Sequence, residues 1–172
     1  MAFLFPNMIE IIKGSFDDIP VIRTLAYQIW PLVYTEIISL EQINYMLETR
    51  YNEKILLEQM LNGQQFFLAK VGNDYLGYAG VAPTELEGLF KLEKLYVVPD
   101  NHKKGVGSIL LKAAEQFATE NGGDALTLQV NRSNAAVVFY KKMGFIVDRE
   151  EDVEIGNGFY MNDYFMAKKI VK

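Results

Sequence analysis

The fold of this chain can be read from the stretch Lys94-Leu95-Tyr96-Val97-Val98-Pro99-Asp100-Asn101-His102-Lys103-Lys104-Gly105-Val106-Gly107-Ser108. Strand-forming residues come first, a basic turn with two glycines follows, and apolar residues at helical spacing come next. The pattern predicts a helix whose first backbone N–H groups lack partners within the helix, which suits an anion such as a phosphate. Gly105 and Gly107 leave room for phosphate oxygens, and Lys103 and Lys104 add positive charge.

Two better-known phosphate motifs do not fit this turn. A Walker A loop needs glycine, four further residues and then Gly-Lys-Ser/Thr, and the dinucleotide fingerprint needs a third glycine and an acidic residue after the next strand. The next expected strand ends instead in Val130-Asn131. Taken alone, Gly105-Val106-Gly107 also fits a plain tight turn whose neighbouring lysines point into solvent.

The remaining sequence predicts a single mixed α/β domain over residues 1–172. Capping residues, glycines and prolines bound its segments. The expected order is a strand at 8–13, a helix that starts at a Ser15–Asp18 capping box and is closed by Pro31, a helix from a Ser39–Gln42 capping box, a helix at 55–61, strands at 66–71, 75–81 and 91–98, a helix at 107–120, a strand at 125–131, a helix at 133–143, and two strands about Gly156-Asn157-Gly158. The three strands between 66 and 98 are typical of an antiparallel meander.

Composition narrows the classes of function. The 172 residues are 50% hydrophobic and 23% charged, which suffices for one core but not for two ordinary domains. With a net charge of -5, the chain lacks the broad basic surface of a protein that binds nucleic acid. The absence of cysteine and the single histidine, His102, exclude thiolate chemistry and argue against a metal site. No leader pattern or bilayer-spanning apolar run is visible, so we expect a soluble cytoplasmic protein without a membrane partner.

A second motif follows the expected strand at 125–131. The segment Asn134-Ala135-Ala136-Val137-Val138-Phe139-Tyr140-Lys141-Lys142-Met143-Gly144-Phe145 predicts a short amphipathic helix, with Ser133 as its N-cap and Gly144 as the glycine that ends it. Together with His102-Lys103-Lys104-Gly105-Val106-Gly107, in this order and separation, it resembles the GNAT superfamily of N-acetyltransferases. That family carries the patterns Gln/Arg-x-x-Gly-x-Gly/Ala and Asn-x-x-Ala-x-x-Phe-Tyr-x-x-x-Gly-Phe, and the order of elements over nearly the whole chain is also similar to its fold.

The resemblance implies a mostly antiparallel mixed sheet, flanked by helices and splayed where the cofactor, acetyl-CoA, binds. It implies that the pyrophosphate rests on the backbone amides of residues 103–108 and that the pantetheine arm runs along residues 95–97. His102 departs from the pattern, which has Gln or Arg there; an imidazole still donates to a phosphate, so we expect weaker or pH-sensitive binding. Asn134 also fits a cap or turn. The implied cofactor-binding residues are Leu95, Tyr96, Val97, His102, Lys103, Lys104, Gly105, Val106, Gly107, Ser108, Asn131, Asn134 and Tyr140.

Two residues are candidates for acid–base work. An amine with an ordinary pKa of about 10 must lose a proton before it attacks a thioester, and without cysteine the simplest route is direct attack in a ternary complex. Glu93 lies just before the strand segment that faces the cofactor and is the candidate base, with a solvated strand glutamate as the alternative. A backbone N–H near Val97 is expected to stabilise the oxyanion. Tyr140 is the candidate acid, because a phenol with a pKa of about 10 protonates a departing thiolate of about 8.5 at little penalty; an aromatic that only fills space on the helix is the alternative.

The amine acceptor is expected between the N-terminal helices and the last strands. Aromatic rings with carboxylates suit a cation, and with the acidic net charge they predict a small, polyamine-like amine. Residues 30–47 also loosely resemble bacterial polyamine acetyltransferases. The candidate substrate-binding residues are Trp30, Tyr34, Glu36, Tyr160, Asp163 and Tyr164, although such aromatics more often fill core or surface.

Other functions stay open at this point. The acceptor could be an amino acid, an aminoglycoside, a protein N-terminus or a lysine. A regulatory module that binds CoA without turnover would keep the glycine turn, and an unrelated phosphate-binding α/β domain would be stabilised equally by a plain nucleotide. Homodimers are common in the family, but no apolar seam in this sequence identifies an interface.

Overall fold

The computed structural model describes residues 8–170, except for the side chains of His102 and Lys103. Seven strands form one mixed sheet in the order β1-β2-β3-β4-β5-β7-β6. All neighbouring strands are antiparallel except β4 and β5, which are parallel. The strands are β1 (Glu10–Lys13), β2 (Gln65–Val71), β3 (Asp74–Pro83), β4 (Leu89–Val97), β5 (Ala125–Asn131), β6 (Ile146–Gly156) and β7 (Phe159–Lys169).

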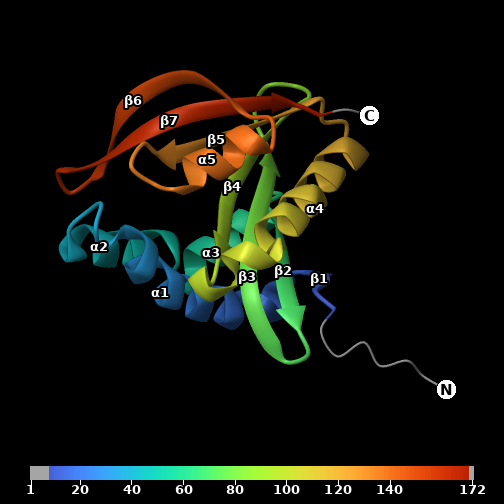
Figure 1. The fold of residues 1–172 in the computed structure, drawn as a ribbon, viewed down its shortest axis with the longest axis horizontal. Helices are drawn as coiled ribbons and strands as arrows, with labels where there is room; N and C mark the ends of the chain where they lie inside the picture. Colours follow the sequence, from blue (N-terminus) through green and yellow to red (C-terminus); the bar gives the residue numbers. More distant parts are fainter. Residues whose placement is uncertain (1–7, 171–172) are drawn as a thin grey trace.

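Helices cover both faces of the sheet, as Figure 1 shows. One apolar core lies between the sheet and α1 (Ile19–Tyr34), α2 (Leu40–Arg50) and α3 (Glu53–Leu61). A second core lies between the opposite face and α4 (Val106–Glu120) and α5 (Ala136–Lys142). Short 3-10 turns, η1 (Phe16–Asp18) and η2 (Pro99–Lys104), precede α1 and α4. The predicted fold class, a mostly antiparallel mixed sheet flanked by helices, is confirmed.

Two predicted helix boundaries are wrong. Pro31 does not close the first helix, which continues to Tyr34 because Trp30 and Tyr34 are buried in the core on that side. Ser133 is not an N-cap. Side-chain oxygens of Asn131 and Asn134 accept hydrogen bonds from the Ser133 and Ala136 N–H groups, both at 2.9 Å, so two turns carry the chain from β5 and α5 begins only at Ala136. The first strand also starts later than expected, at Glu10.

The β6–β7 hairpin, drawn in orange and red in Figure 1, reaches across to α2. Gln42 Nε2 donates to the Tyr160 carbonyl at 2.6 Å, and the Tyr45 hydroxyl donates to the Ile155 carbonyl at 3.1 Å. The Tyr45 and Phe159 rings are in contact, with centroids 5.3 Å apart. α2 is thereby joined to the tip of the hairpin. Within residues 8–170, no helix combines the length and apolarity that crossing a bilayer requires.

Candidate active site

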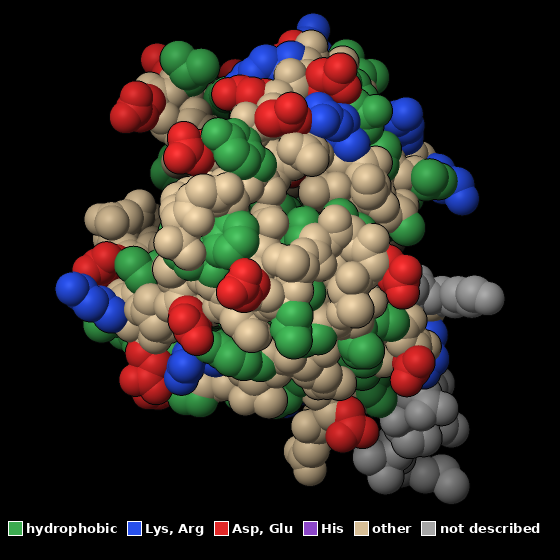
Figure 2. Space-filling view, turned by 90° about the vertical axis from the view of Figure 1, so that its left-hand side faces the viewer, with side chains coloured by type: hydrophobic (Ala, Val, Ile, Leu, Met, Phe, Trp, Pro, Cys, Tyr) green, Lys and Arg blue, Asp and Glu red, His purple; other side chains and the backbone are tan. Residues whose placement is uncertain are grey.

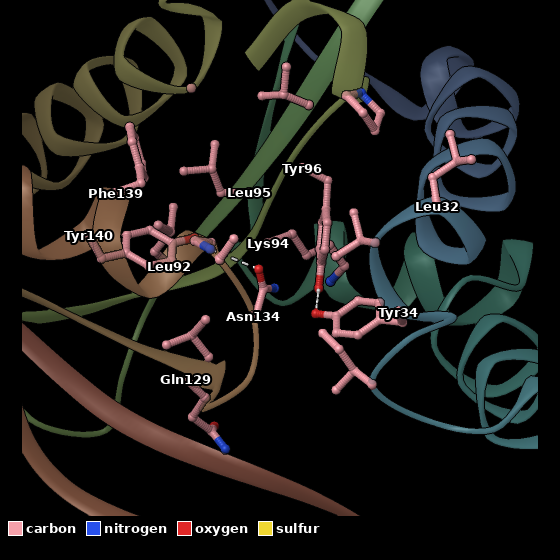
Figure 3. A pocket seen from close by; sticks show the side chains of 18 of the residues that line it. Leu32, Tyr34, Leu92, Lys94, Leu95, Tyr96, Gln129, Asn134, Phe139 and Tyr140 are labelled. Carbon is pink, nitrogen blue, oxygen red and sulfur yellow. Dashed lines mark hydrogen bonds between the residues drawn. The ribbon is translucent and has the colours of Figure 1, made fainter. Parts of the chain in front are cut away.

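A cleft opens where β4 and β5 separate. The two parallel strands pair only from Leu89 to Lys91 and from Ala125 to Thr127, although both strands continue beyond. The space between them has a volume of about 720 Å³ and is lined by residues of α1, β4, β5, α5 and the start of α4. Figure 3 shows α5 side chains on one wall and α1 side chains on the other. The separation of two strands within one continuous sheet thus provides the cavity.

The start of α4 forms one end of this cleft. Gly105 is the N-cap residue with φ +76°, a left-handed conformation that favours glycine, and no side chain caps the helix. Val106 is fully buried and anchors the turn in the core beneath α4. Gly105, Gly107 and Ser108 line the cleft. The first amides of α4 are therefore held rigidly at a cavity and without side-chain competitors, as an anion site requires.

The predicted phosphate-binding residues differ in their placement. Lys104 is exposed and is not among the cleft-lining residues, and Val106 points into the core, so any role of Val106 in cofactor binding belongs to its backbone. The side chains of His102 and Lys103 lie outside the described part of the structure. Further along the cleft, Leu95, Tyr96 and Val97 of β4 line the wall, as expected for a segment that faces the pantetheine arm.

Tyr140 lies on the α5 wall. Its ring packs against Phe139 and Phe145, with centroids 5.4 and 5.6 Å away, and the residue is only 6% exposed. Burial raises the pKa of the Tyr140 phenol well above its ordinary value. A phenol keeps its proton at neutral pH even at its ordinary pKa of about 10, so the effect of burial is to make the Tyr140 hydroxyl a weaker acid than the sequence alone suggests.

Glu93 also lines the cleft, from a β-bulge in β4. Gly80 of β3 pairs with Lys94 and Val81 pairs with Leu92, so Glu93 is an extra residue on β4 without a partner on β3. Bulges redirect side chains, and this one places Glu93 in the lining of the cleft. Its carboxylate lies 3.6 Å from Lys91 Nζ, and its side chain is 33% exposed.

Of the two predicted asparagines, only Asn134 lines the cleft. Asn131 is buried behind it and uses its Oδ1 in the turn described above. Asn134 also uses its Oδ1 in a turn, while its side chain interacts with the Tyr34 hydroxyl across the cleft. A turn role is thus shown for both side chains.

The predicted acceptor-binding residues fall into two groups. Tyr34 and Glu36 line the cleft, and the Tyr34 and Tyr96 hydroxyls are 3.0 Å apart, as drawn in Figure 3. Trp30 is buried behind them, 4.5 Å from Tyr34 and 5.5 Å from Tyr96 between ring centroids. The other three do not line the cleft: Tyr160 is 51% exposed on the hairpin, Tyr164 packs against the core under α4 and α5, and Asp163 is buried. Burial raises the pKa of Asp163 to about 6.

Several residues that line the cleft were not predicted from the sequence. Lys94 is buried on β4; its Nζ donates to Gln59 Oε1 at 2.8 Å and Gln64 Oε1 at 3.1 Å, and burial lowers its pKa to about 8. A lysine inside the run Leu92-Glu93-Lys94-Leu95-Tyr96 is a signal that could have marked it. The remaining cleft residues, whose ordinary apolar or polar character gives no such signal, include Leu32, Val33, Ile37, Gln129, Ser133, Phe139 and Met143.

Comparison with known proteins agrees with this geometry. Residues 35–166 match the family described as acetyltransferase (GNAT) domain. The chain is 28% identical to spermidine N(1)-acetyltransferase of Thermoplasma acidophilum over 171 residues, which cover 94% of this chain and 97% of that protein. It is 32% identical to streptothricin acetyltransferase of Streptomyces lavendulae over 85 residues, 49% of this chain and 45% of the other.

Solved structures show the same arrangement. The crystal structure of the PaiA N-acetyltransferase of Thermoplasma acidophilum in complex with coenzyme A superimposes with a TM-score of 0.80 at 27% identity, over 94% of this chain and 99% of that one. This chain thus has relatives that are acetyltransferases, and it carries the glycine turn at the start of α4, the separated strands and the α5 motif. The protein belongs to the GNAT family, as an N-acetyltransferase with acetyl-CoA as its cofactor.

Proposed function

We propose that the protein acetylates a primary amine of a small cationic molecule, by direct attack within a ternary complex. The observation that carries this proposal is that Glu93, Tyr140 and the start of α4 all line one cleft. An acid, a base and an anion site in one cavity meet the needs of acetyl transfer from a CoA thioester to an ammonium ion.

The donor half of the site is built from backbone. Uncapped amides at Gly105, Gly107 and Ser108 suit the pyrophosphate, and the edge of β4 at residues 95–97, where pairing with β5 has ended, suits the pantetheine arm. Acetyl-CoA supplies an acetyl group already activated as a thioester. A rigid glycine turn holds its phosphates without having to reorganise.

Two side chains transfer the protons that the reaction requires. Glu93 takes a proton from the acceptor ammonium, directly or through water, which frees the lone pair that forms the new C–N bond. Tyr140, protonated at neutral pH as any phenol is, gives its proton to the sulfur as the C–S bond breaks. The products are the acetylated amine and CoA thiol. A backbone N–H near Val97 stabilises the negative carbonyl oxygen.

The acceptor half favours a cation with an aliphatic body. Glu36 and Glu93 contribute carboxylates to the cleft, and Leu32 and Val33 of α1, with Ile37 just after it, contribute apolar lining. Figure 2 shows the side of the molecule that carries α2 and the hairpin, where Asp and Glu side chains are spread over the face and Lys and Arg side chains lie mainly toward its margins. The relative that acts as a spermidine N(1)-acetyltransferase supports a polyamine-like acceptor.

Thiol release tests the proposal. Purified protein is mixed with acetyl-CoA and, separately, with spermidine, a short diamine, an amino acid, an aminoglycoside and a peptide with a free N-terminus. We expect CoA thiol to appear fastest with spermidine. Acetyl-CoA binding without amine-dependent thiol would favour a regulatory module, and a maximum with the peptide would favour a protein acceptor. A homodimer and a cytoplasmic location stay predictions, which solution mass and cell fractionation check.

A further inference from the structure

A row of polar side chains in contact with one another crosses the point where β4 and β5 separate. Lys91 is the last β4 residue that pairs with β5, and its Nζ donates to Gln129 Oε1 at 2.6 Å. The same Nζ lies 3.6 Å from Glu93 Oε2. Gln129 Nε2 in turn donates to Asp163 Oδ2 at 3.5 Å. Three strands, β4, β5 and β7, therefore meet through these four side chains.

The four side chains differ in their access to the cleft. Glu93 and Gln129 line it, one on each of the separated strands, whereas Lys91 and Asp163 do not. Lys91 has a side-chain exposure of 29% and bonds to both lining residues. It therefore ties the two walls together directly behind the position assigned to the base.

The side chain of Glu93 needs a partner that fixes its conformation. As the extra residue of a bulge it has no partner on β3, and the register of β4 with β5 has ended before it. A glutamate side chain has several rotatable bonds and, when a third exposed, populates several rotamers unless a partner selects one. Lys91 is the partner that the described structure provides.

We infer that Lys91 is a positioning residue for the reaction. It holds the Glu93 carboxylate at the cleft, and it fixes the Gln129 amide with Oε1 toward Lys91 and Nε2 toward Asp163. This inference rests on the proposed function, because Lys91 acts through the base. A partly exposed ion pair of this kind contributes little to stability, so the loss of Lys91 should reduce turnover and leave the fold intact.

A double-mutant cycle tests the inference, with Lys91→Met, Glu93→Gln and the combined variant. Lys91→Met should lower kcat on the order of tenfold, since misplacement of a catalytic group costs up to about a hundredfold. The KM for acetyl-CoA should stay within about twofold. The combined variant should be no slower than Glu93→Gln, because the lysine has nothing left to position. Lys91→Arg, which keeps the charge and a donor, should recover most of kcat.

Lys70→Met is the matched control. Lys70 is another half-buried strand lysine in an ion pair, with Glu10 at 3.8 Å, and lies on β2 outside the cleft lining. Its loss should leave kcat and both KM values unchanged. Lys91→Met with wild-type kcat, or losses that multiply in the combined variant, would overturn the role of Lys91 alone. A wild-type protein that releases no thiol with any amine would overturn the proposed function and this inference with it.

Discussion

Replacement of Lys94 by Met should change how the stability of the protein depends on pH. The ammonium of Lys94 is buried, held by two glutamine oxygens and packed over the rings of Tyr51 and Phe66. Among the described residues no carboxylate is bonded to it, although the charge of Glu93 acts on it and partly offsets the effect of burial. Burial lowers its pKa from the ordinary 10.5 to about 8 in the folded chain. That difference corresponds to a penalty of about 3 kcal/mol on folding at neutral pH.

The sign follows from proton binding. At pH values between about 8 and 10.5 the unfolded chain holds a proton on this lysine that the folded chain has lost. The free energy of unfolding therefore rises with pH in this range, by about 2 kcal/mol from pH 7 to pH 9.5. The range stops there because the buried phenols of Tyr51 and Tyr78, whose pKa values are raised in the fold, lower stability once unfolded tyrosines ionise.

Urea unfolding at pH 7, 8, 9 and 9.5 measures this contribution as the difference between wild type and Lys94→Met. Loss of the amine also leaves Gln59 and Gln64 without a donor, so the absolute stability at one pH is not diagnostic, whereas the slope against pH is. Lys112→Met on the exposed face of α4 is the control and should keep the wild-type slope. An equal slope in wild type and Lys94→Met would refute the reasoning.

Two further predictions concern activity and are measured with the thiol assay, and a third concerns stability and CoA binding. Tyr140→Phe should lower kcat about a hundredfold, because it removes the acid, with acetyl-CoA affinity nearly unchanged; full turnover would remove Tyr140 from the mechanism. Glu36→Gln should raise the KM for spermidine several-fold and leave the KM for acetyl-CoA alone, since Glu36 lies at the acceptor end; equal effects on both would place it elsewhere. Gly105→Ala should destabilise the fold by about 1 kcal/mol and weaken CoA binding, because φ +76° at the turn is strained for alanine. Gly122 has a similar φ of +86° but lies away from the cleft, so Gly122→Ala is the control. Calorimetric titration of both variants with CoA separates the loss of binding from the loss of stability.

Local patterns predict the elements that we propose bind the cofactor. The glycine turn from Gly105 to Gly107 and the segment around Tyr140 are contiguous in sequence, and their hydrophobic spacing and turn residues mark the start of α4 and the α5 helix. The boundary errors have equally local causes. Pro31 predicts a helix end, but α1 continues to Tyr34 because Tyr34, in the following turn, is buried. The turns made by the two asparagines before Ala136 take the place of the cap expected at Ser133.

The polar cluster where β4 and β5 separate could not be predicted in the same way. Gln129, Lys91 and Asp163 come from three strands and meet only through the parallel pairing of β4 with β5 and the antiparallel pairing of β5 with β7. Nothing within a short window of sequence marks such a meeting. The bulge at Glu93 likewise depends on the register of β4 with β3. Tyr164 and Asp163 are neighbours on a strand, so their side chains point to opposite faces of the sheet, which the presence of aromatic and acidic residues in the sequence does not reveal.

The link between α2 and the hairpin has a consequence for how this architecture can diversify. Gln42 and Tyr45 donate hydrogen bonds to main-chain carbonyls of the hairpin, so these two bonds, unlike the Tyr45–Phe159 ring contact, do not depend on which side chains the hairpin carries. Side chains on successive hairpin residues alternate between the two faces of the ribbon, so an insertion of one matched pair per strand would lengthen the span while preserving orientation. The ribbon beside α2 can thus change in length, while the glycine turn at the start of α4, on the opposite face of the sheet, is left as it is.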